Sequence, residues 1–451
     1  VSVNPRITSA TYDASSGALV VTATNLQANG GGADIDASLF TFTGESGTTY
    51  TLTDSADVEI TSASAFTITL STTDKATVNQ IVNKNGTVST GSTTYNLAAA
   101  DNWNTNATGG DTADGAGNGI TVSNVAAPAI TSATYDASTG ALAVTGTDFL
   151  KASGATNDID ASKFTFTGEG GATYTLTDTA NVEITSGTAF TLTLSATDKV
   201  GVNLIANKNG TSSTGGTTYN LAAAEDWAAG ADAAVTVADA AGNGITVSNV
   251  AAPAITSTTY DTGSGILAVT GSGFLKASGA ANDIDVSKFT FTGEGGATYT
   301  LTDSTDVEIT SGETFTLTLS ATDKAAVNLL LNKTGTSSTD ATIYNLAAAE
   351  DWATGADAAV NVADPAGNGI TVTVVTPSSG GGGGGGGSGN STTTTIDGVE
   401  IATTTQPDGT VITTLLPITA TRKDDPSSLL RDHADIPLIT GASGNTLLTI
   451  S

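Results

Sequence analysis

Short runs of alternating apolar and polar residues fill most of this chain, and turn residues separate them. In residues 128–252 the runs lie at 130–135, 141–146, 164–167, 174–177, 182–185, 190–194, 235–237 and 245–247. Alternation with a period of two is typical of strands that bury one face and leave Thr or Ser on the other. Gly and Asp stand between the runs, as at 136–140 and 168–171, where hairpin turns are expected. The pattern therefore predicts seven or eight short antiparallel strands.

One segment changes to a helical period. Ser195 and Asp198 have the spacing of a capping box, and Val202, Ile205 and Ala206 follow at positions that share one helix face. The spacing predicts a helix with Lys208 in its last turn and Gly210 as its stop. A second short helix is expected over 221–227 (LAAAEDW), because alanine favours helix.

The whole pattern occurs three times. Trp103, Trp227 and Trp352 occupy equivalent positions spaced 124 and 125 residues apart. A unit of about 125 residues can bury a core of its own. We therefore predict an all-β chain with one short helix in each unit, built of tandem immunoglobulin-like β-sandwich repeats. The predicted boundaries are 1–127, 128–252 and 253–376 for the repeats, 377–391 for a Gly/Ser linker and 392–451 for a C-terminal β segment.

The segments between and after the repeats predict how the units connect. Only residues 251–254, which include Pro253, separate the last strand of the second repeat from the next strand. So short a joint containing proline is expected to be stiff and to stack the repeats as a rod. After the third repeat, the glycine run at 380–387 predicts a flexible coil. Beyond it we expect a hairpin of 399–405 with 410–415, and two more strands at 436–439 and 447–450, in a partial domain or a strand-donating tail.

Composition narrows the functional classes. The 451 residues include 44 Asp and Glu against 14 Lys and Arg, and no cysteine or methionine. A net charge of −30 argues against nucleic acid and anionic membranes as partners, because both need basic patches. Without cysteine there is no disulfide, thiol nucleophile or thiolate metal site. The sequence contains no apolar run of about 20 residues, so no transmembrane segment is predicted.

Acidic loops recur at fixed places and are candidate calcium ligands, because Ca²⁺ takes six to eight oxygen atoms. The candidates in the first loop are Asp34 and Asp36, then Asn157, Asp158 and Asp160, and then Asn282, Asp283 and Asp285. A second oxygen-rich turn contributes Asp239 and Asn243, and Asp364 and Asn368. The alternative is structural: an Asx turn leading into a strand for the first loop, and an ordinary hairpin turn for the second. Dense negative charge, which repels itself unless cations screen it, motivates the calcium prediction.

Other candidate chemistry is sparse. The three equivalent tryptophans are expected in the cores, with sugar stacking as the alternative. No nucleophile elbow, zinc-binding helix or phosphate loop is present, and the single histidine, His433, lies in a polar segment. We therefore expect no catalytic site.

The repeat itself carries a resemblance. The segments ITSATYDASTGALAVTGTDF, GEGGATYTLTD, LSATDKVGVNLIANKNG, YNLAAAEDW and AGNGITVSNV together resemble the tandem immunoglobulin-like repeats of large secreted bacterial surface proteins. Those proteins are adhesins, biofilm matrix components or surface-layer-like proteins. The resemblance implies an extracellular structural subunit of a surface fibre, filament or lattice, self-association into a homopolymer, and calcium. Two other functions stay open: an adhesin stalk that holds a ligand-binding tip away from the cell, and accessory repeats of a secreted enzyme.

Overall fold

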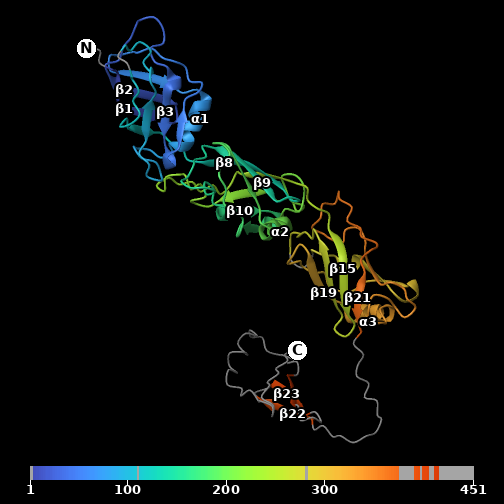
Figure 1. Ribbon diagram of the computed structural model, residues 1–451. Helices are drawn as coiled ribbons and strands as arrows, with labels where there is room; N and C mark the ends of the chain where they lie inside the picture. Colours follow the sequence, from blue (N-terminus) through green and yellow to red (C-terminus); the bar gives the residue numbers. More distant parts are fainter. Residues whose placement is uncertain are drawn as a thin grey trace, which may run out of the picture. The chain divides into compact units, whose positions relative to one another are not determined.

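The computed structural model describes residues 4–108, 111–279 and 283–374, and three strands at 391–396, 399–405 and 411–415. The chain divides into two compact units, Val1–Val375 and Thr376–Ser451. The first unit contains the three repeats, which are called repeats 1, 2 and 3 and follow one another along it (Figure 1). In the described residues no helix is long and apolar enough to cross a bilayer.

Repeat 2 shows the architecture most completely. Its elements are β8 (Ala129–Asp136), β9 (Ala141–Thr147), β10 (Phe164–Thr167), β11 (Thr173–Thr175), β12 (Ala189–Thr193), α2 (Ala196–Ile205), β13 (Asn220–Ala223) and β14 (Gly244–Ser248). The strand order is β11-β10-β13-β14-β8-β9-β12. β14 pairs with β8 in parallel, and the other neighbours pair antiparallel. A single register pair, Asn220 with Gly244, joins β13 to β14. The sheet therefore folds there into two layers, β12-β9-β8-β14 and β11-β10-β13.

Repeats 1 and 3 have the same two layers as separate sheets. Repeat 1 consists of β1 (Arg6–Asp13), β2 (Ala18–Thr24), β3 (Phe40–Thr43), β4 (Thr49–Thr51), β5 (Ala65–Thr69), α1 (Thr72–Ile81), β6 (Asn96–Ala99) and β7 (Ile120–Ser123). Repeat 3 consists of β15 (Ala254–Asp261), β16 (Ile266–Ser272), β17 (Phe289–Thr292), β18 (Thr298–Thr300), β19 (Thr314–Thr318), α3 (Ala321–Leu330), β20 (Asn345–Ala348) and β21 (Ile370–Thr373). The predicted fold class, all-β tandem immunoglobulin-like sandwiches with one helix each, is confirmed.

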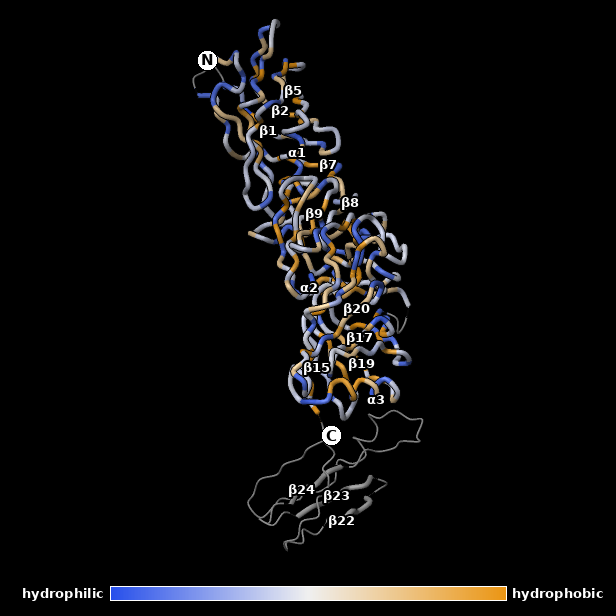
Figure 2. The backbone as a smooth tube through the Cα atoms, turned by 90° about the vertical axis from the view of Figure 1, so that its right-hand side faces the viewer, coloured by the Kyte–Doolittle hydropathy of each residue, from blue (hydrophilic) through white to orange (hydrophobic). Residues whose placement is uncertain are grey.

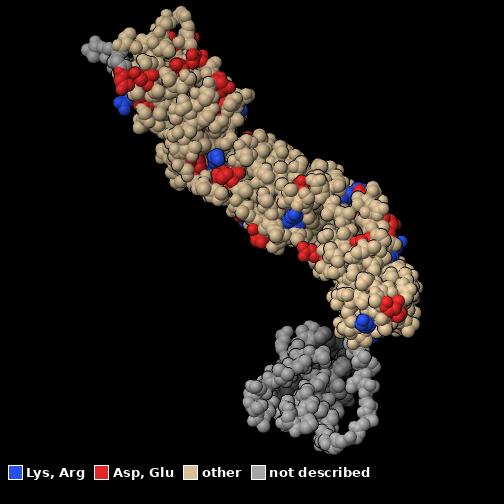
Figure 3. Space-filling model, turned by 45° about the vertical axis from the view of Figure 1, so that its right-hand side comes forward, with Lys and Arg blue, Asp and Glu red and all other residues tan. Residues whose placement is uncertain are grey.

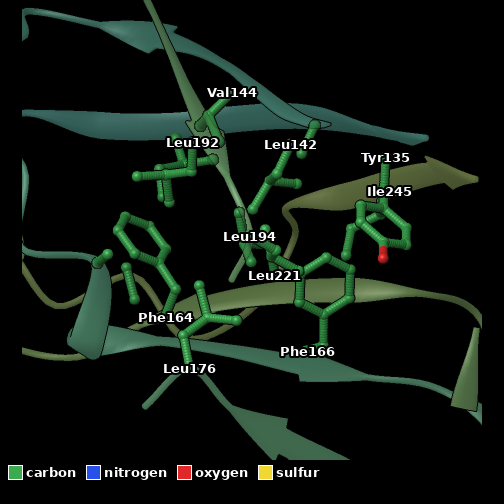
Figure 4. Packing of buried hydrophobic residues seen from close by; sticks show 14 of the residues in the cluster. Tyr135, Leu142, Val144, Phe164, Phe166, Leu176, Leu192, Leu194, Leu221 and Ile245 are labelled. Carbon is green, nitrogen blue, oxygen red and sulfur yellow. The ribbon is translucent and has the colours of Figure 1, made fainter. Parts of the chain in front are cut away.

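Each repeat buries its own aromatic core between the layers. In repeat 2 the apolar residues of β9, β10 and β12 point inward and alternate with exposed or half-buried ones. Tyr135 and Phe166 meet across the layers with ring centroids 5.3 Å apart (Figure 4). Apolar residues along the backbone gather inside each repeat in Figure 2. The three cores contain no shared buried residue, because each cluster stays within one repeat.

Three sequence-based element assignments are wrong. The predicted strand 182–185 forms only an isolated bridge, Val182 with Ile159. The predicted strand 235–237 forms no ladder, because side chains take its backbone groups: Glu225 accepts the Val237 N–H and the Trp227 indole donates to the Val237 carbonyl. The predicted helix 221–227 is not formed: 221–223 belong to strand β13, and a turn follows at 225–226. Leu221 and Ala223 point inward and the backbone pairs with β10, so tertiary pairing outweighs the helix preference of alanine.

The predicted main helix is confirmed, with a different end. Ser195 caps α2 by accepting the Asp198 N–H at 3.0 Å. The helix ends at Ile205, so Lys208 lies beyond it and not in its last turn. α2 buries Val202 and Ile205 and lies against β11.

Asp198 ties the first turn of α2 to the segment after β11. Its fully buried carboxylate accepts six hydrogen bonds: from the Tyr174 hydroxyl, from the N–H and hydroxyl groups of Thr177 and Thr179, and from the Asp178 N–H. Asp74 and Asp323 have the same arrangement in repeats 1 and 3. A carboxylate with this many donors acts as a structural anchor rather than a free acid.

The second unit contains an antiparallel sheet of β22 (Ser391–Ile396), β23 (Val399–Thr405) and β24 (Val411–Leu415) in that order. The predicted hairpin of 399–405 with 410–415 is confirmed. Of the predicted linker 377–391, only Ser391 is described, and it begins β22. The predicted strands 436–439 and 447–450, and His433, lie outside the described residues.

Candidate functional site: the acidic loops and the joints between repeats

The first acidic loop is built around one buried carboxylate in each repeat. In repeat 2, Asp158 is fully buried and accepts the N–H groups of Ala152 at 2.6 Å and Ile184 at 2.9 Å. Lys151 Nζ lies 3.6 Å from Asp158 and 3.6 Å from Glu183. Burial raises the pKa of Asp158, and the neighbouring Glu183 acts in the same direction. Asp283 has the same partners in repeat 3, including Lys276 at 3.6 Å.

Repeat 1 lacks the lysine. Its buried Asp34 accepts hydrogen bonds from the N–H groups of Asn29 and Ile60 and from the side-chain amide of Asn106. In all three repeats this carboxylate therefore fastens the loop to segments distant in sequence.

The other candidates of this loop have local partners. Asp36, Asp160 and Asp285 each cap a single-turn 3-10 helix by accepting the N–H and hydroxyl of the serine two residues later. The Asn157 amide donates to the Ser153 carbonyl. Asn282 lies outside the described residues. These contacts are those of the Asx turn that was the structural alternative.

The second acidic turn holds the start of each repeat. Asp239 Oδ2 accepts the N–H of Ile130, which follows the joint between repeats 1 and 2, at 2.9 Å. Asn243 donates to the carbonyl of Leu221 and to the Asp239 carboxylate. Asp364 accepts the N–H of Ile255 at 2.9 Å, and Asn368 donates to Leu346. The turn therefore connects the last hairpin of a repeat to its first strand.

Replacing Asp239 with alanine is expected to lower the free energy of unfolding of repeat 2 by about 1–3 kcal/mol, because the Ile130 N–H loses its acceptor. Hydrogen exchange of repeat 2 amides measures this, with Asp239→Asn as the control that keeps an acceptor oxygen. Equal protection in the alanine variant and the native protein would contradict the role given to Asp239.

The predicted calcium ligands do not come together as a cation site in the described parts of the chain. No group of three or more His, Cys, Asp or Glu side chains there could hold a metal ion. In the first loop of repeats 2 and 3, backbone N–H groups and a lysine already face the carboxylates, so these residues do not fit a calcium ion that needs six to eight oxygens. Calcium binding stays a prediction from the negative charge of the chain and from the sequence resemblance, and the geometry does not support it at these positions.

Chelation tests this directly. Because Lys151 and Lys276 already face the two carboxylate pairs, we expect the melting midpoint of the full chain to be the same in excess EDTA and in millimolar calcium. Magnesium serves as the control for nonspecific screening of charge. A midpoint that falls by several degrees on chelation and recovers with calcium alone would show that cation sites exist.

The tryptophans belong to the cores. Trp103, Trp227 and Trp352 are fully buried, and each indole N–H donates to a backbone carbonyl nine or ten residues later. Their rings are therefore not available for sugar stacking in this conformation.

The joints between repeats are formed by a matched set of contacts, which the sequence patterns did not predict. Between repeats 1 and 2, the Lys151 N–H donates to the Gln80 carbonyl at 3.0 Å. The Asn83 amide donates to the Lys151 carbonyl at 2.8 Å, and the Thr90 hydroxyl to the Gly230 carbonyl at 3.0 Å. An ion pair of Lys84 with Asp232, 3.3 Å long, completes the set.

The same set recurs between repeats 2 and 3. Its members are Lys276 N–H to Leu204 carbonyl at 3.0 Å, Asn207 amide to Lys276 carbonyl at 2.8 Å, Thr214 hydroxyl to Gly355 carbonyl at 3.0 Å, and Lys208 to Asp357 at 3.5 Å. Lys208, which the sequence placed in a helix, therefore serves the joint. The half-exposed ion pair contributes little by itself, about 0–1 kcal/mol. The directional hydrogen bonds are what fix one repeat against the next.

A buried glutamate lies at the centre of each joint. Glu169 is 3% exposed and accepts the Asn207 amide at 2.9 Å and the Gly215 N–H at 2.8 Å. Burial raises its pKa, but these hydrogen bonds and the Ser278 hydroxyl of repeat 3 outweigh that effect, so the net pKa is lowered. Glu45 makes the equivalent contacts with Asn83 and Gly91. Acidic side chains elsewhere are scattered over the visible face of the first unit (Figure 3).

Comparisons with known proteins add no functional assignment. No protein-family model matches the chain, and none of the curated proteins is similar to it in sequence. An I-band fragment of titin is 10% identical, with 83% of this chain and 100% of that chain covered and a TM-score of 0.19. A structure described as the basis of Dscam isoform specificity is 10% identical, with 83% and 77% covered and a TM-score of 0.15. At these TM-scores the likeness carries no argument, and the strand order assigns the fold.

Proposed function

We propose that this chain is a non-catalytic extracellular structural protein whose repeats act as a spacer of fixed geometry. The observation that supports it is the recurrence of one joint: the same four contacts link repeat 1 to repeat 2 and repeat 2 to repeat 3. A protein that holds a fixed distance needs consecutive units in one repeated orientation. A chain that only tethers would not need directional contacts at each joint.

In this proposal the protein is a subunit of a bacterial surface fibre, filament or lattice, and its partner is a second copy of the chain. β11 and β12 are the outer strands of the repeat 2 sheet. Outer strands present unpaired backbone N–H and C=O groups, which pair readily with a strand of another chain. The resemblance of the repeats to secreted bacterial surface proteins supports the location outside the cell.

Negative-stain electron microscopy of the purified full chain tests this function. Ordered filaments or two-dimensional lattices are the expected result. Isolated particles that bind a surface or a ligand would favour the adhesin stalk instead, and isolated particles with neither property would contradict both functions.

A further inference from the structure

The end of repeat 3 carries the face that repeats 1 and 2 use to bind the next repeat. Five of its residues correspond to those of the joint between repeats 2 and 3: Glu294, Leu329, Asn332, Lys333 and Thr339 stand where repeat 2 has Glu169, Leu204, Asn207, Lys208 and Thr214. Leu204 packs against the core of repeat 3, whereas Leu329 is 77% exposed. The face is thus retained in sequence but unpaired among the described residues of the first unit.

One position of this face has a different residue type in repeat 3 than in repeats 1 and 2. Gly91 and Gly215 stand at equivalent places in repeats 1 and 2, and Asp340 stands there in repeat 3. A Cβ atom at Gly215 would lie 2.2 Å from Glu169 Oε1 and 2.6 Å from the Ser278 hydroxyl of repeat 3. At Gly91 it would lie 2.1 Å from Glu45 and 2.8 Å from Ser153 of repeat 2. A side chain there therefore requires both the buried glutamate carboxylate and the serine hydroxyl of the next repeat to move.

In repeat 3 the glutamate accepts its short backbone hydrogen bond from a different residue of this turn. The Gly215 N–H donates to Glu169 at 2.8 Å, whereas the Asp340 N–H is 3.4 Å from Glu294. The Thr339 N–H, one residue earlier, donates to Glu294 at 2.9 Å instead. The carboxylate of Asp340 is held in place by the Thr342 N–H and the Ser338 hydroxyl.

The Asp340 carboxylate also binds the turn that faces the next repeat in a joint. In the joint, Ser278 of repeat 3 lies against Gly170 of repeat 2, since a Cβ at Gly170 would be 3.3 Å from the serine Cβ. Gly295 is the equivalent of Gly170, and its N–H donates to Asp340 at 2.9 Å. Asp340 therefore binds, from within its own repeat, the N–H of the residue against which the serine of a following repeat would rest.

We propose that Asp340 ends the array: glycine at this position allows the next repeat to dock, and aspartate closes the face to it. Docking would also remove water from around Asp340 and Glu294, which lie close together in repeat 3, and two like charges in a water-excluded joint oppose each other. The inference concerns how repeats associate and does not depend on the proposed function. It excludes lengthwise polymerisation through this joint, so copies of the chain associate through other surfaces.

The test introduces an aspartate at the equivalent position of the joint between repeats 2 and 3, in the full chain. Because the protein has no cysteine, Thr191→Cys and Thr316→Cys, at exposed positions of repeats 2 and 3, allow two spin labels to be attached. Double electron–electron resonance should give one narrow distribution of distances between the two labels in the otherwise native chain. Gly215→Asp should broaden it at least twofold, while Gly216→Asp, next in the same turn and with no atom within 4 Å of a Cβ, should not. A distribution as narrow with Gly215→Asp as without it would overturn the proposal.

A second experiment tests the role of Asp340 even if Gly215→Asp unfolds repeat 2. A copy of residues 251–375 is inserted after residue 375, and the labels are placed at Thr316 and at its counterpart in the copy. With Asp340 intact the distribution should be broad, and Asp340→Gly in the original repeat 3 should make it narrow. A narrow distribution with Asp340 intact, or a broad one after Asp340→Gly, would refute its role as the terminator.

Discussion

Replacing Asp198 with alanine is expected to lower the free energy of unfolding of repeat 2 by about 3–5 kcal/mol. The substitution removes the acceptor for six hydrogen bonds, among them those from the N–H and hydroxyl groups of the buried Thr179. Hydrogen exchange resolved by peptide mass measures the loss in repeat 2 and uses repeats 1 and 3 of the same molecule as internal references.

Two variants make this result specific. Thr197→Ala changes an exposed neighbour in α2 and should alter stability by less than about 0.5 kcal/mol. Asp198→Asn keeps the shape but loses the charge, so its effect should be intermediate. If Asp198→Ala were no more harmful than Thr197→Ala, the carboxylate would not be an anchor.

The same network predicts how stability depends on pH. Burial alone would raise the pKa of Asp198, but the hydrogen bonds from Thr179 and Thr177 outweigh it and hold the pKa far below the ordinary value of 3.8. Asp74 and Asp323 behave alike. A carboxylate with a lowered pKa stabilises the fold fully above its unfolded pKa and loses that contribution as pH falls through its folded pKa. The contribution of these three carboxylates to the free energy of unfolding should therefore be constant above about pH 5, and the unfolding midpoints should fall below about pH 4. In Asp198→Asn the fall for repeat 2 should be shallower, and an identical slope would contradict the assignment.

Replacing Asn207 with aspartate should open the joint between repeats 2 and 3 without unfolding either repeat. The new carboxylate would face Glu169, whose Oε2 lies 2.9 Å from the Asn207 amide, and it would lose the bond to the Lys276 carbonyl. An unpaired buried charge of this kind costs about 3 kcal/mol or more. The distribution of distances between spin labels at positions 191 and 316 should change from narrow to broad.

Asn209→Asp is the matched control. Asn209 is exposed two residues away, and the oxygen with which it accepts the Val250 N–H is kept in aspartate. It adds the same charge to the same loop but should leave the distribution narrow. Equal broadening by both variants would mean that net charge, rather than the contacts of Asn207, governs the joint.

The sequence predicts most of the fold because the local signals agree with the tertiary arrangement. Ser195 caps the helix as its spacing indicates, and the alternating runs of β8, β9, β10 and β12 each bury one face. Prediction fails where a distant partner decides. The sequence of β13 predicts a helix because its pairing with β10 is not visible in the local pattern. Val237 is predicted in a strand, but the side chains of Glu225 and Trp227 take its backbone groups instead of a neighbouring strand.

The candidate sites were predicted less well for the same reason. The sequence shows carboxylates in a loop but not that Ala152, Ile184 and Lys151 face Asp158. The joint residues look like ordinary polar loop residues, because their partners lie in another repeat. Comparing the repeats position by position would have provided a signal: glycine at 91 and 215 is aspartate at 340. Only the structure shows that this position faces the next repeat.

The contacts of the joint give consecutive repeats one fixed orientation. Residual dipolar couplings measured on repeats 2 and 3 of the native chain, each isotope-labelled in turn, test it most directly. Both repeats should report one alignment tensor of equal magnitude and direction. Tensors that differ in magnitude between the two repeats would show that they reorient independently and that the joint is not rigid.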